Sequence, residues 1–364
     1  MDQKERENRI ADAIGPLDNF YKKHARKLPW REEPTPYHVW VSEIMLQQTR
    51  VEAVKGYYAR FMDALPDVYA LATASEDACN KLWEGLGYYS RVRNLQKAAK
   101  VIVDTYGGEL PETYAELRKL PGIGFYTAAA IASIAYGKNE AAVDGNILRV
   151  VTRLLAEEQD ISDQKYRQEI KTLLEDAYQK RDKKKSRAGI YNQAFMDLGA
   201  TVCIPNGTPL CDKCPLAKCC KAHEEKTELN YPVKVSKKAR TIEQKTVLLV
   251  TLGEEVLLKK RPEKGLLAGL YEYPCLEGHK TKKEILKALE DIGIQAVKIE
   301  KIGSAKHIFT HKEWHMIGYR IKADEILGKE ELTKEGKYLF ASISDCNTKY
   351  AIPSAYKAFR ITEI

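Results

Sequence analysis

Four cysteines late in the first two thirds of the chain have a spacing that suits a metal site. Cys203, Cys211, Cys214 and Cys220 are separated by seven, two and five residues. Four thiolates suit either tetrahedral zinc or a [4Fe–4S] cluster, but zinc ribbons usually use two close pairs, and here only Cys211 and Cys214 form one. Cys219 is an alternative to Cys220 as the fourth ligand. Crowded cysteines of this kind are no pattern for a disulfide-stapled secreted domain, so we expect a metal centre in a reducing compartment.

Two carboxylates lie in segments that could place them beside a substrate. Glu43 lies within HVWVSEIMLQQT, which is rich in large apolar residues, and Asp144 precedes a helical pattern in AAVDGNILRV. The ordinary interpretation is a solvated carboxylate for Glu43 and a helix N-cap for Asp144. In a closed apolar pocket, desolvation would raise the pKa of Glu43 and make it a general acid near neutral pH. A capped Asp144 would stay ionised and could face a developing cation, so the pair would suit cleavage of a glycosidic bond.

A Gly-rich turn, LPGIG at residues 120–124, joins two helical patterns. Gly122 and Gly124 allow the backbone to turn tightly and to approach a ligand closely. The helix that follows begins with free N–H groups, which can hold a phosphate oxygen. A plain helical corner is the alternative. If the turn does bind DNA, it would hold the backbone without reading the bases.

Helical patterns dominate up to about residue 225. Apolar residues recur every three or four positions over 37–61 and 146–155, and residues 112–120 and 125–137 also favour helix. Pro and Gly residues separate these segments, and no convincing period-2 strand is found among them. This part of the chain is therefore predicted to be all-α.

The character of the sequence changes near residue 226. Residues 226–240 are polar and Lys-rich, which predicts a linker. TVLLVTL (246–252) and EEVLLKKR (254–261), joined by Gly253, predict a β-hairpin. An amphipathic helix is expected over 282–294, and further strands at 296–302, 314–321 and 338–343. The second part is predicted to be α+β.

Length and composition indicate a soluble globular protein of two or three domains. The chain has 364 residues, of which 44% are hydrophobic and 30% charged, which excludes a disordered chain. No apolar run approaches the roughly 18 residues needed to span a bilayer, and MDQKERENRI is too polar for a signal peptide. We therefore expect a cytoplasmic protein that does not contact a membrane. The net charge of +8, most of it in residues 226–364, is compatible with a nucleic-acid partner but also with an ordinary protein of high pI.

Taken in order, the motifs resemble those of the helix-hairpin-helix DNA glycosylases with an iron–sulfur cluster, the endonuclease III superfamily. LPGIGFYTAAAI, VDGN and the four cysteines carry this resemblance, while LPWR, SEIMLQQTRV and GLGYYSRVRNL narrow it to the MutY-type adenine DNA glycosylases. The match covers about residues 8–225. It implies an all-α, two-lobed glycosylase region at 1–225, with one [4Fe–4S] cluster held in the loop 203–220. The linker at 226–240 and a Nudix-like 8-oxoguanine recognition domain at 241–364 would follow.

The resemblance also implies the reaction and its residues. The enzyme would be a nucleoid-associated monomer that removes adenine mispaired with 8-oxoguanine or guanine from duplex DNA. Glu43 would be the general acid and Asp144 the carboxylate facing the sugar, supported by Tyr126 and Asn146. Cys203, Cys211, Cys214 and Cys220 would bind the cluster. The adenine pocket would be lined by Arg26, Leu28, Trp30, Arg31, Leu46 and Gln193, and Gln48, Thr49, Leu86 and Tyr88 would contact the opposite strand and fill the gap in the base stack, with Gly122 and Gly124 at the DNA backbone.

Three alternatives differ from this interpretation in identifiable ways. Bifunctional glycosylase/lyases of the superfamily carry Lys where this chain has Tyr126, because Schiff-base attack on the sugar needs an amine. The thymine-mismatch glycosylases resemble this chain at Tyr126 but lack the acid at Glu43 and a second domain. A non-enzymatic DNA-binding protein with a structural cluster would leave Glu43 and Asp144 without a role.

The second part resembles a lesion-recognition domain that has lost hydrolytic activity. HIFTHKEWHM (307–316) is similar to the family's 8-oxoguanine-sensing loop, with Thr310 where Ser is commoner and His311 beside it. A core hydroxyl and a surface histidine are the alternative for these two residues. Leu286 and Lys287 stand where a hydrolytic Nudix helix has an Arg–Glu pair, so the Mg²⁺ site is predicted to be lost.

The cysteine loop differs from the family pattern in the gap between Cys203 and Cys211, which is seven residues instead of the usual six. The extra residue can bulge at Asn206–Gly207 without moving the ligands.

Overall fold

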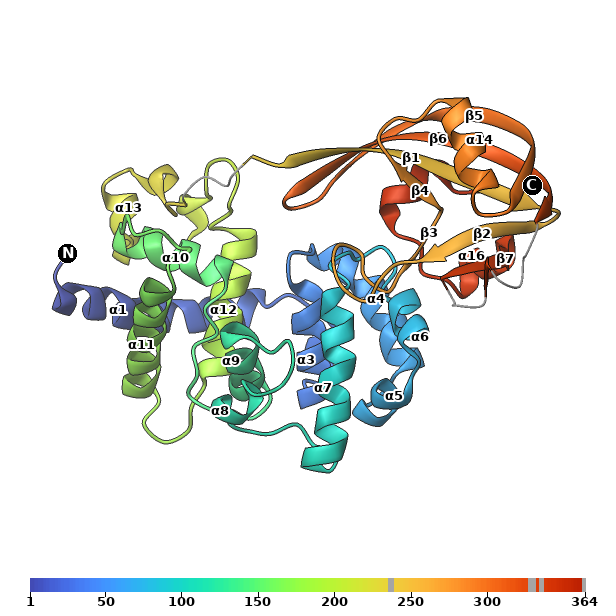
Figure 1. The fold of residues 1–364 in the computed structure, drawn as a ribbon. Coiled ribbons are helices and arrows are strands. Elements are labelled where there is room, and N and C mark those ends of the chain that lie inside the picture. Colours follow the sequence, from blue (N-terminus) through green and yellow to red (C-terminus); the bar gives the residue numbers. More distant parts are fainter. Residues whose placement is uncertain (235–238, 327–331, 334–336, 362–364) are drawn as a thin grey trace. The chain divides into compact units, whose positions relative to one another are not determined.

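The computed structural model describes the whole chain except residues 235–238, 327–331, 334–336 and 362–364 (Figure 1). Its contacts divide it into two compact units, Met1–Ala72 with Lys97–Ser236, and Thr73–Gln96 with Lys237–Ile364. Residues 73–96 therefore cluster with the C-terminal part although they lie within the predicted glycosylase region. The domain boundaries predicted from the sequence, at residues 225 and 240, remain a prediction.

The regular elements before residue 225 are helices, as predicted. In chain order they are α1 (Gln3–His24), α2 (Pro29–Glu32), α3 (Pro36–Leu46), α4 (Val51–Ala64), α5 (Val68–Thr73), α6 (Glu76–Leu82), α7 (Ser90–Tyr106), α8 (Tyr114–Leu117), α9 (Phe125–Ile134), α10 (Gly145–Leu155), α11 (Gln164–Arg181), α12 (Ala188–Thr201) and α13 (Lys221–Glu224), with short 3₁₀ turns η1 (Cys211–Lys213) and η2 (Ala217–Cys219).

The helices that carry the predicted chemistry start at residues suited to that position. Thr35 caps α3 by accepting a hydrogen bond from the His38 N–H, and Pro36 supplies a helical φ angle at the first position. Gly124 precedes α9, and Gly122, with φ of 75°, makes the tight turn before it. Asp144 caps α10, which then packs into the apolar core of the first unit. These local signals fix where α3, α9 and α10 begin, and Glu43, Tyr126 and Asp144 lie on or next to these three helices.

The first part of the predicted linker is bound to the helical unit. The Arg153 side chain donates hydrogen bonds to the carbonyls of Glu228 and Tyr231, and the Ile161 N–H donates to the Val233 carbonyl. Glu228 belongs to the 3₁₀ turn η3 (Glu228–Asn230). Residues 235–238 of the predicted linker lie outside the described residues.

A mixed sheet forms the centre of the second unit. Its strand order is β3-β2-β1-β6-β5; β4 also pairs with β1 and β7 with β2, and β1 runs parallel to β6 while the other pairs are antiparallel. The β1–β2 hairpin around Gly253 confirms that prediction. The strands are β1 (Thr241–Leu252), β2 (Glu255–Lys260), β3 (Tyr271–Glu272), β4 (Cys275–Glu277), β5 (Ile294–Ile308), β6 (Lys312–Ile326) and β7 (Tyr338–Ser342).

Both faces of this sheet are covered, which explains the apolar run in β1. Val247 and Leu249 face one core with Tyr356 and Phe359, from the 3₁₀ turn η4 (Ser354–Phe359). Leu248 and Val250 face the other, with residues of α14 (Lys282–Glu290). Successive side chains on a strand point to opposite faces, so a strand covered on both faces is apolar throughout. Helix α16 (Ile343–Thr348) follows β7.

The segment 73–96 is bound to the rest of the second unit by polar contacts. The Lys81 ammonium donates to the carbonyls of Cys346 and Tyr350, and the Tyr271 hydroxyl donates to the Asp77 carboxylate at 3.0 Å. Arg93 donates to the Ala268 carbonyl at 2.6 Å. These contacts join α6 and the start of α7 to the part of the unit that contains the β-sheet.

Candidate active site and cysteine cluster

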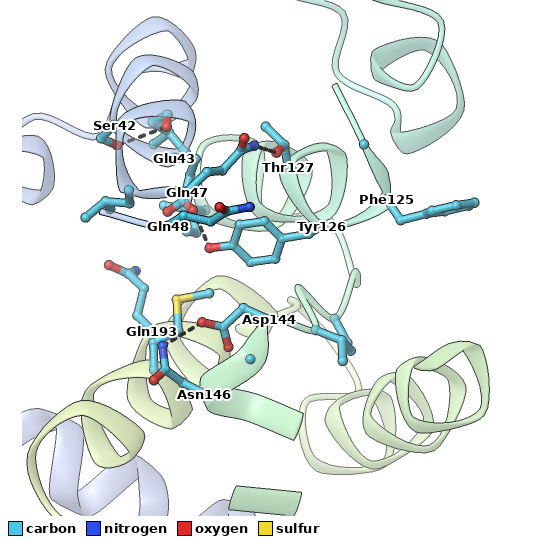
Figure 2. Close-up of a pocket in the computed structure, with 18 of the residues that line it drawn as sticks. Ser42, Glu43, Gln47, Gln48, Phe125, Tyr126, Thr127, Asp144, Asn146 and Gln193 are labelled. Carbon is cyan, nitrogen blue, oxygen red and sulfur yellow. Dashed lines mark hydrogen bonds between the residues drawn. The ribbon is translucent and has the colours of Figure 1, made fainter. Parts of the chain in front are cut away.

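A cavity of about 970 Å³ in the helical unit collects most of the predicted site residues (Figure 2). Its walls come from the segment between α1 and α3, from α3 and the turn after it, and from residues of α9, α10, α11 and α12. Thirteen of the predicted residues line it, namely Arg26, Leu28, Trp30, Arg31, Glu43, Leu46, Gln48, Thr49, Gly124, Tyr126, Asp144, Asn146 and Gln193. Gly122 is not among the residues that line the cavity, and Leu86, Tyr88, Thr310 and His311 belong to the other unit.

Glu43 is a buried acid and not a solvated surface carboxylate. The residue is 6% exposed, and it lies on a helix in which every residue from Val39 to Met45 is buried. Burial raises the pKa of Glu43 to about 7, with the nearby Asp144 charge acting in the same direction. A hydrogen bond from the Tyr126 hydroxyl opposes this shift. The ordinary interpretation of Glu43 is therefore wrong, and the carboxyl has the proton affinity of an acid that works near neutral pH.

Tyr126 supports a different carboxylate from the one expected. Its hydroxyl donates to Glu43, whereas the resemblance implied support for Asp144. The two oxygens of Asp144 instead accept N–H groups, from Ile147 and from Asn146. Burial and the two carboxylates raise the pKa of Tyr126 well above its usual value, so the phenol remains a donor. In Figure 2 the side chains of Glu43, Tyr126 and Asp144 converge on one space, while Phe125 points away from it.

Asp144 serves as helix cap and site residue at once. One oxygen accepts the Ile147 backbone N–H at 2.7 Å and the other accepts the Asn146 side-chain amide at 2.7 Å. Burial raises the pKa of Asp144, but these two bonds and the Arg149 charge favour the ionised form. The same cavity thus holds one carboxyl with a high proton affinity and one carboxylate with N–H donors on both oxygens, the pairing that glycosidic cleavage requires.

Arg149 is a site residue that the sequence interpretation missed. Its guanidinium donates to the Asn146 side-chain carbonyl at 2.9 Å and to the Cys203 backbone carbonyl at 2.8 Å. Because the Asn146 oxygen faces this donor, its NH₂ group must face Asp144. A signal was present in the sequence, since Arg149 interrupts the apolar pattern of residues 146–155. In the structure the residue is only 6% exposed.

Asp197 is a second residue that was missed, and it orients two arginines of the pocket. It is completely buried on α12, where it accepts hydrogen bonds from Arg26 at 2.7 Å and from Arg31 at 2.8 Å. The signal available in the sequence was an aspartate among the apolar residues of AFMDLGA, since aspartate is rarely buried unless it is paired. Its carboxylate fixes the two guanidinium groups against the cavity wall.

The four predicted cysteine ligands line a small apolar cavity beside α10. Cys203, Cys211, Cys214 and Cys220 contribute to its wall, and Cys219 is not among the residues that line it. The Cys219 thiol donates to the Leu216 carbonyl, and the Cys220 thiol donates to the Arg153 carbonyl. Burial raises the pKa of Cys211 and of Cys214 to about 12, so these thiols need a bound cation to ionise. The donor set and its apolar surroundings fit a four-thiolate centre. His223 and Glu228 lie close to Cys211, with ligand atoms within 4.8 Å of one another.

The predicted residues of the second unit lie around a single contact. The Tyr88 hydroxyl is 3.0 Å from the Thr310 hydroxyl, and Tyr88 is 48% exposed. His311 is exposed, and its carbonyl accepts the Thr241 N–H. Leu86, in the same turn between α6 and α7 as Tyr88, is buried. Thr310 is therefore placed at a surface with Tyr88, rather than in a core.

Comparison with known proteins identifies the family. Residues 41–176 match the HhH-GPD superfamily of base excision DNA repair proteins, and residues 246–360 match the NUDIX domain. The chain is 33% identical to an adenine DNA glycosylase of Buchnera aphidicola, over 82% of this chain and 84% of that protein. The chain belongs to the adenine DNA glycosylase family. This confirms the resemblance inferred from the motifs, and the DNA glycosylase class with it.

A second curated relative and two solved structures are also similar to this chain. The human adenine DNA glycosylase is 35% identical over 82% of this chain, which spans 64% of the human protein's length. A thermostable thymine-DNA glycosylase superposes on 60% of this chain with a TM-score of 0.53 and 26% identity. An endonuclease III–DNA complex, at 23% identity and a TM-score of 0.52, shows the same fold. The predicted fold class, a helical helix-hairpin-helix region followed by a Nudix-like domain, is confirmed. Among the described helices, none has the length and apolar character needed to cross a membrane.

Proposed function

We propose that this chain is a monofunctional enzyme that excises adenine paired with 8-oxoguanine or guanine in duplex DNA, acting as a monomer. One observation carries the proposal: Glu43 and Asp144 line one cavity, with the pKa of Glu43 raised to about 7 and Asp144 bonded by N–H donors on both oxygens. Membership of the family supports adenine as the base and DNA as the substrate.

Glu43 would deliver the proton that releases the base. Adenine leaves poorly as an anion, so an acid must protonate a ring nitrogen before the glycosidic bond breaks. The Tyr126 hydroxyl, bonded to one Glu43 oxygen, leaves the other oxygen to hold the transferable proton. Arg26 and Arg31, fixed by Asp197, would line the pocket for the flipped base with Leu28, Trp30, Leu46 and Gln193.

Asp144 would stabilise the positive charge that develops on the sugar. Bond cleavage leaves an oxocarbenium-like sugar, and a carboxylate already fixed by hydrogen bonds needs no reorganisation to face it. Asn146 holds one Asp144 oxygen, and Arg149 fixes Asn146 in turn. Because Tyr126 has no amine, water would be the acceptor at the sugar.

The remaining residues would hold the duplex and recognise the lesion. Gly122 and Gly124 would present backbone N–H groups to the DNA backbone, and Gln48, Thr49 and Leu86 would contact the opposite strand. Tyr88 would enter the gap that the flipped adenine leaves. Thr310 and His311 would recognise 8-oxoguanine, and the contact between the Tyr88 and Thr310 hydroxyls supports a shared role for these two residues.

Cys203, Cys211, Cys214 and Cys220 would hold one [4Fe–4S] cluster. Such a cluster would cross-link the loop 203–220 through four iron–thiolate bonds. Arg153 donates to the Cys203 sulfur at 3.2 Å, and N–H donors to cluster thiolates stabilise their negative charge. Arg149, which contacts the Cys203 carbonyl, would link the position of this loop to Asn146.

The proposed activity is tested by incubating the protein with a duplex that carries adenine opposite 8-oxoguanine, followed by alkali. Free adenine and an alkali-labile strand are expected. A duplex with thymine opposite guanine separates this activity from that of the thymine-mismatch enzymes. DNA binding without release of any base would instead support the non-enzymatic alternative.

The excision rate should depend on the protonation of Glu43. Only the protonated carboxyl can donate, and its pKa is raised to about 7, so the single-turnover rate should fall as the pH rises above about 7. At low pH the rate should fall again, because burial also raises the pKa of Asp144, which must be ionised. Rates and DNA affinity measured over a pH series check this. A rate that is constant across neutral and alkaline pH would contradict the role of Glu43.

The enzyme should form little covalent adduct with DNA when borohydride is present. A lyase forms an imine with the sugar that borohydride reduces to a stable protein–DNA adduct, and Tyr126 cannot form that bond. We expect an intact abasic strand that breaks only after alkali, and little trapped protein. Replacing Tyr126 by Lys places an amine in the cavity and is expected to increase trapping. Efficient trapping of the unmodified protein would overturn the monofunctional assignment.

The purified protein should be brown, with about four iron atoms per chain, as a [4Fe–4S] cluster requires. The Cys220→Ser variant should lose the visible absorption, whereas Cys219→Ser should retain it, because the Cys219 thiol is not among the four that line the cavity. Iron analysis and absorption spectra of the three proteins check this. Stoichiometric zinc without visible absorption would show that the iron assignment is wrong.

A further inference from the structure

The turn between α6 and α7 contains a cluster of left-handed backbone conformations. Gly85 has φ of 102°, Gly87 has φ of 71° and Tyr88 has φ of 49°. Glycine adopts such angles freely, but a residue with a large side chain rarely does. Tyr88 is also 48% exposed, so burial of its ring does not account for the conformation. Strain of this kind persists only where surrounding groups hold the backbone in place.

The peptide group that precedes Tyr88 is held by two donors. The Gly87 carbonyl accepts a hydrogen bond from the Trp83 indole N–H at 3.2 Å and one from the Arg91 guanidinium at 3.0 Å. A carbonyl oxygen has two lone pairs, and both are engaged here. The plane of the Gly87–Tyr88 peptide is therefore fixed, and with it the direction in which the Tyr88 side chain leaves the turn.

Arg91 connects the parts of this turn. The nitrogen that bonds to Gly87 also lies 3.2 Å from the Leu86 carbonyl, and the guanidinium carbon is 5.2 Å from the centre of the Trp83 ring and 5.6 Å from that of Tyr88. Arg91 is only 8% exposed. Burial lowers its pKa to about 10, so the group remains charged at neutral pH and makes charge-assisted hydrogen bonds.

We infer that Arg91 is a positioning residue that holds Tyr88 in the conformation needed to enter the base stack. The inference rests on the proposed function, in which Tyr88 fills the gap left by the flipped adenine. A wedge that is ordered before DNA binds does not lose conformational freedom when it enters the stack. Arg91 would act through Tyr88 and would not touch the DNA itself.

A double-mutant cycle separates this role from simple stabilisation of the fold. The single-turnover excision of adenine opposite 8-oxoguanine is measured for the parent, Arg91→Met, Tyr88→Ala and the double variant. Arg91→Met should slow excision about tenfold, since it removes charge-assisted hydrogen bonds to two carbonyls. In the Tyr88→Ala background the same change should slow excision by less than about twofold, because residues that act as a unit are not additive. An equal loss in both backgrounds would overturn the inference.

Two further variants keep the test valid if Arg91→Met does not fold. Trp83→Phe keeps an aromatic ring at this position and removes one of the two donors to Gly87, so it should cause a smaller loss that also disappears in the Tyr88→Ala background. Arg91→Lys keeps the charge and should recover part of the activity. Lys100→Met, an exposed position on α7, removes one positive charge at a distance from the turn and serves as the matched control.

Hydrogen exchange in the absence of DNA makes the result independent of catalysis. The amides of residues 85–89 should exchange at least about fivefold faster in Arg91→Met than in the parent, while those of α9 remain unchanged. If the parent excises no adenine, the proposed function fails, and the exchange data still decide whether Arg91 orders the turn. Unchanged exchange at 85–89 in a folded Arg91→Met protein would overturn the positioning role.

Discussion

Replacement of Glu43 by glutamine should reduce adenine excision by at least about a hundredfold while leaving DNA binding nearly unchanged. The amide has the same shape and can still accept the Tyr126 hydrogen bond, but it cannot donate a proton to the departing base. Single-turnover kinetics and a binding titration with the mismatched duplex measure the two effects separately. Near-normal excision by this variant would remove Glu43 from its proposed role.

The same substitution should also change how stability depends on pH. The pKa of Glu43 is raised in the folded state from an ordinary 4.5 to about 7, so the folded protein binds this proton more tightly than the unfolded chain does. Stability is therefore lost as the pH rises from about 4.5 through about 7, by up to about 3 kcal/mol from this group. Glu43→Gln removes this dependence, and its Tm relative to the parent should be higher at about pH 8 than at about pH 5.

Glu52→Gln is the matched control for these experiments. Glu52 is an exposed carboxylate on α4. It forms an ion pair with Lys55, which is three residues further along the same helix. Exposed pairs of this type contribute little to stability, so excision and the pH dependence of the Tm should remain those of the parent. If Glu52→Gln reproduced the loss seen with Glu43→Gln, the effect would reflect a change in net charge and not a catalytic proton.

Replacement of Asp144 by asparagine should slow excision by about a hundredfold to a thousandfold. Asparagine is as good a helix N-cap as aspartate, so α10 should remain intact. The variant lacks the negative charge that would face the sugar, and Asn146 cannot turn its oxygen toward the new amide without losing the bond from Arg149. Excision kinetics together with a thermal melt distinguish loss of charge from loss of the helix.

Asp163→Asn provides the corresponding control. Asp163 caps α11 through a 2.8 Å hydrogen bond from the Lys165 N–H and is exposed. The substitution is chemically identical and also falls at a helix N-cap, so it should leave excision unchanged. A comparable loss in Asp163→Asn would mean that the defect of Asp144→Asn arises at the helix start.

The sequence by itself determined the family, the fold class and thirteen of the residues that line the cavity. The LPGIG turn, the VDGN cap and the cysteine spacing are local patterns, and each depends on backbone conformation or ligand chemistry that acts over a few residues. The β1–β2 hairpin at Gly253 could be predicted for the same reason. Local patterns also indicated that Asp144 would cap a helix, and the structure has this cap.

What only the tertiary structure decided depends on groups that are far apart in the chain. The burial of Glu43, the donation by Tyr126 to Glu43 and not to Asp144, and the orientation of Arg26 and Arg31 by Asp197 each join residues from separate helices. The clustering of residues 73–96 with the β-sheet unit is of the same kind. A proton affinity or a hydrogen-bond choice depends on the solvent and charges around a group, and these exist only once the chain has packed.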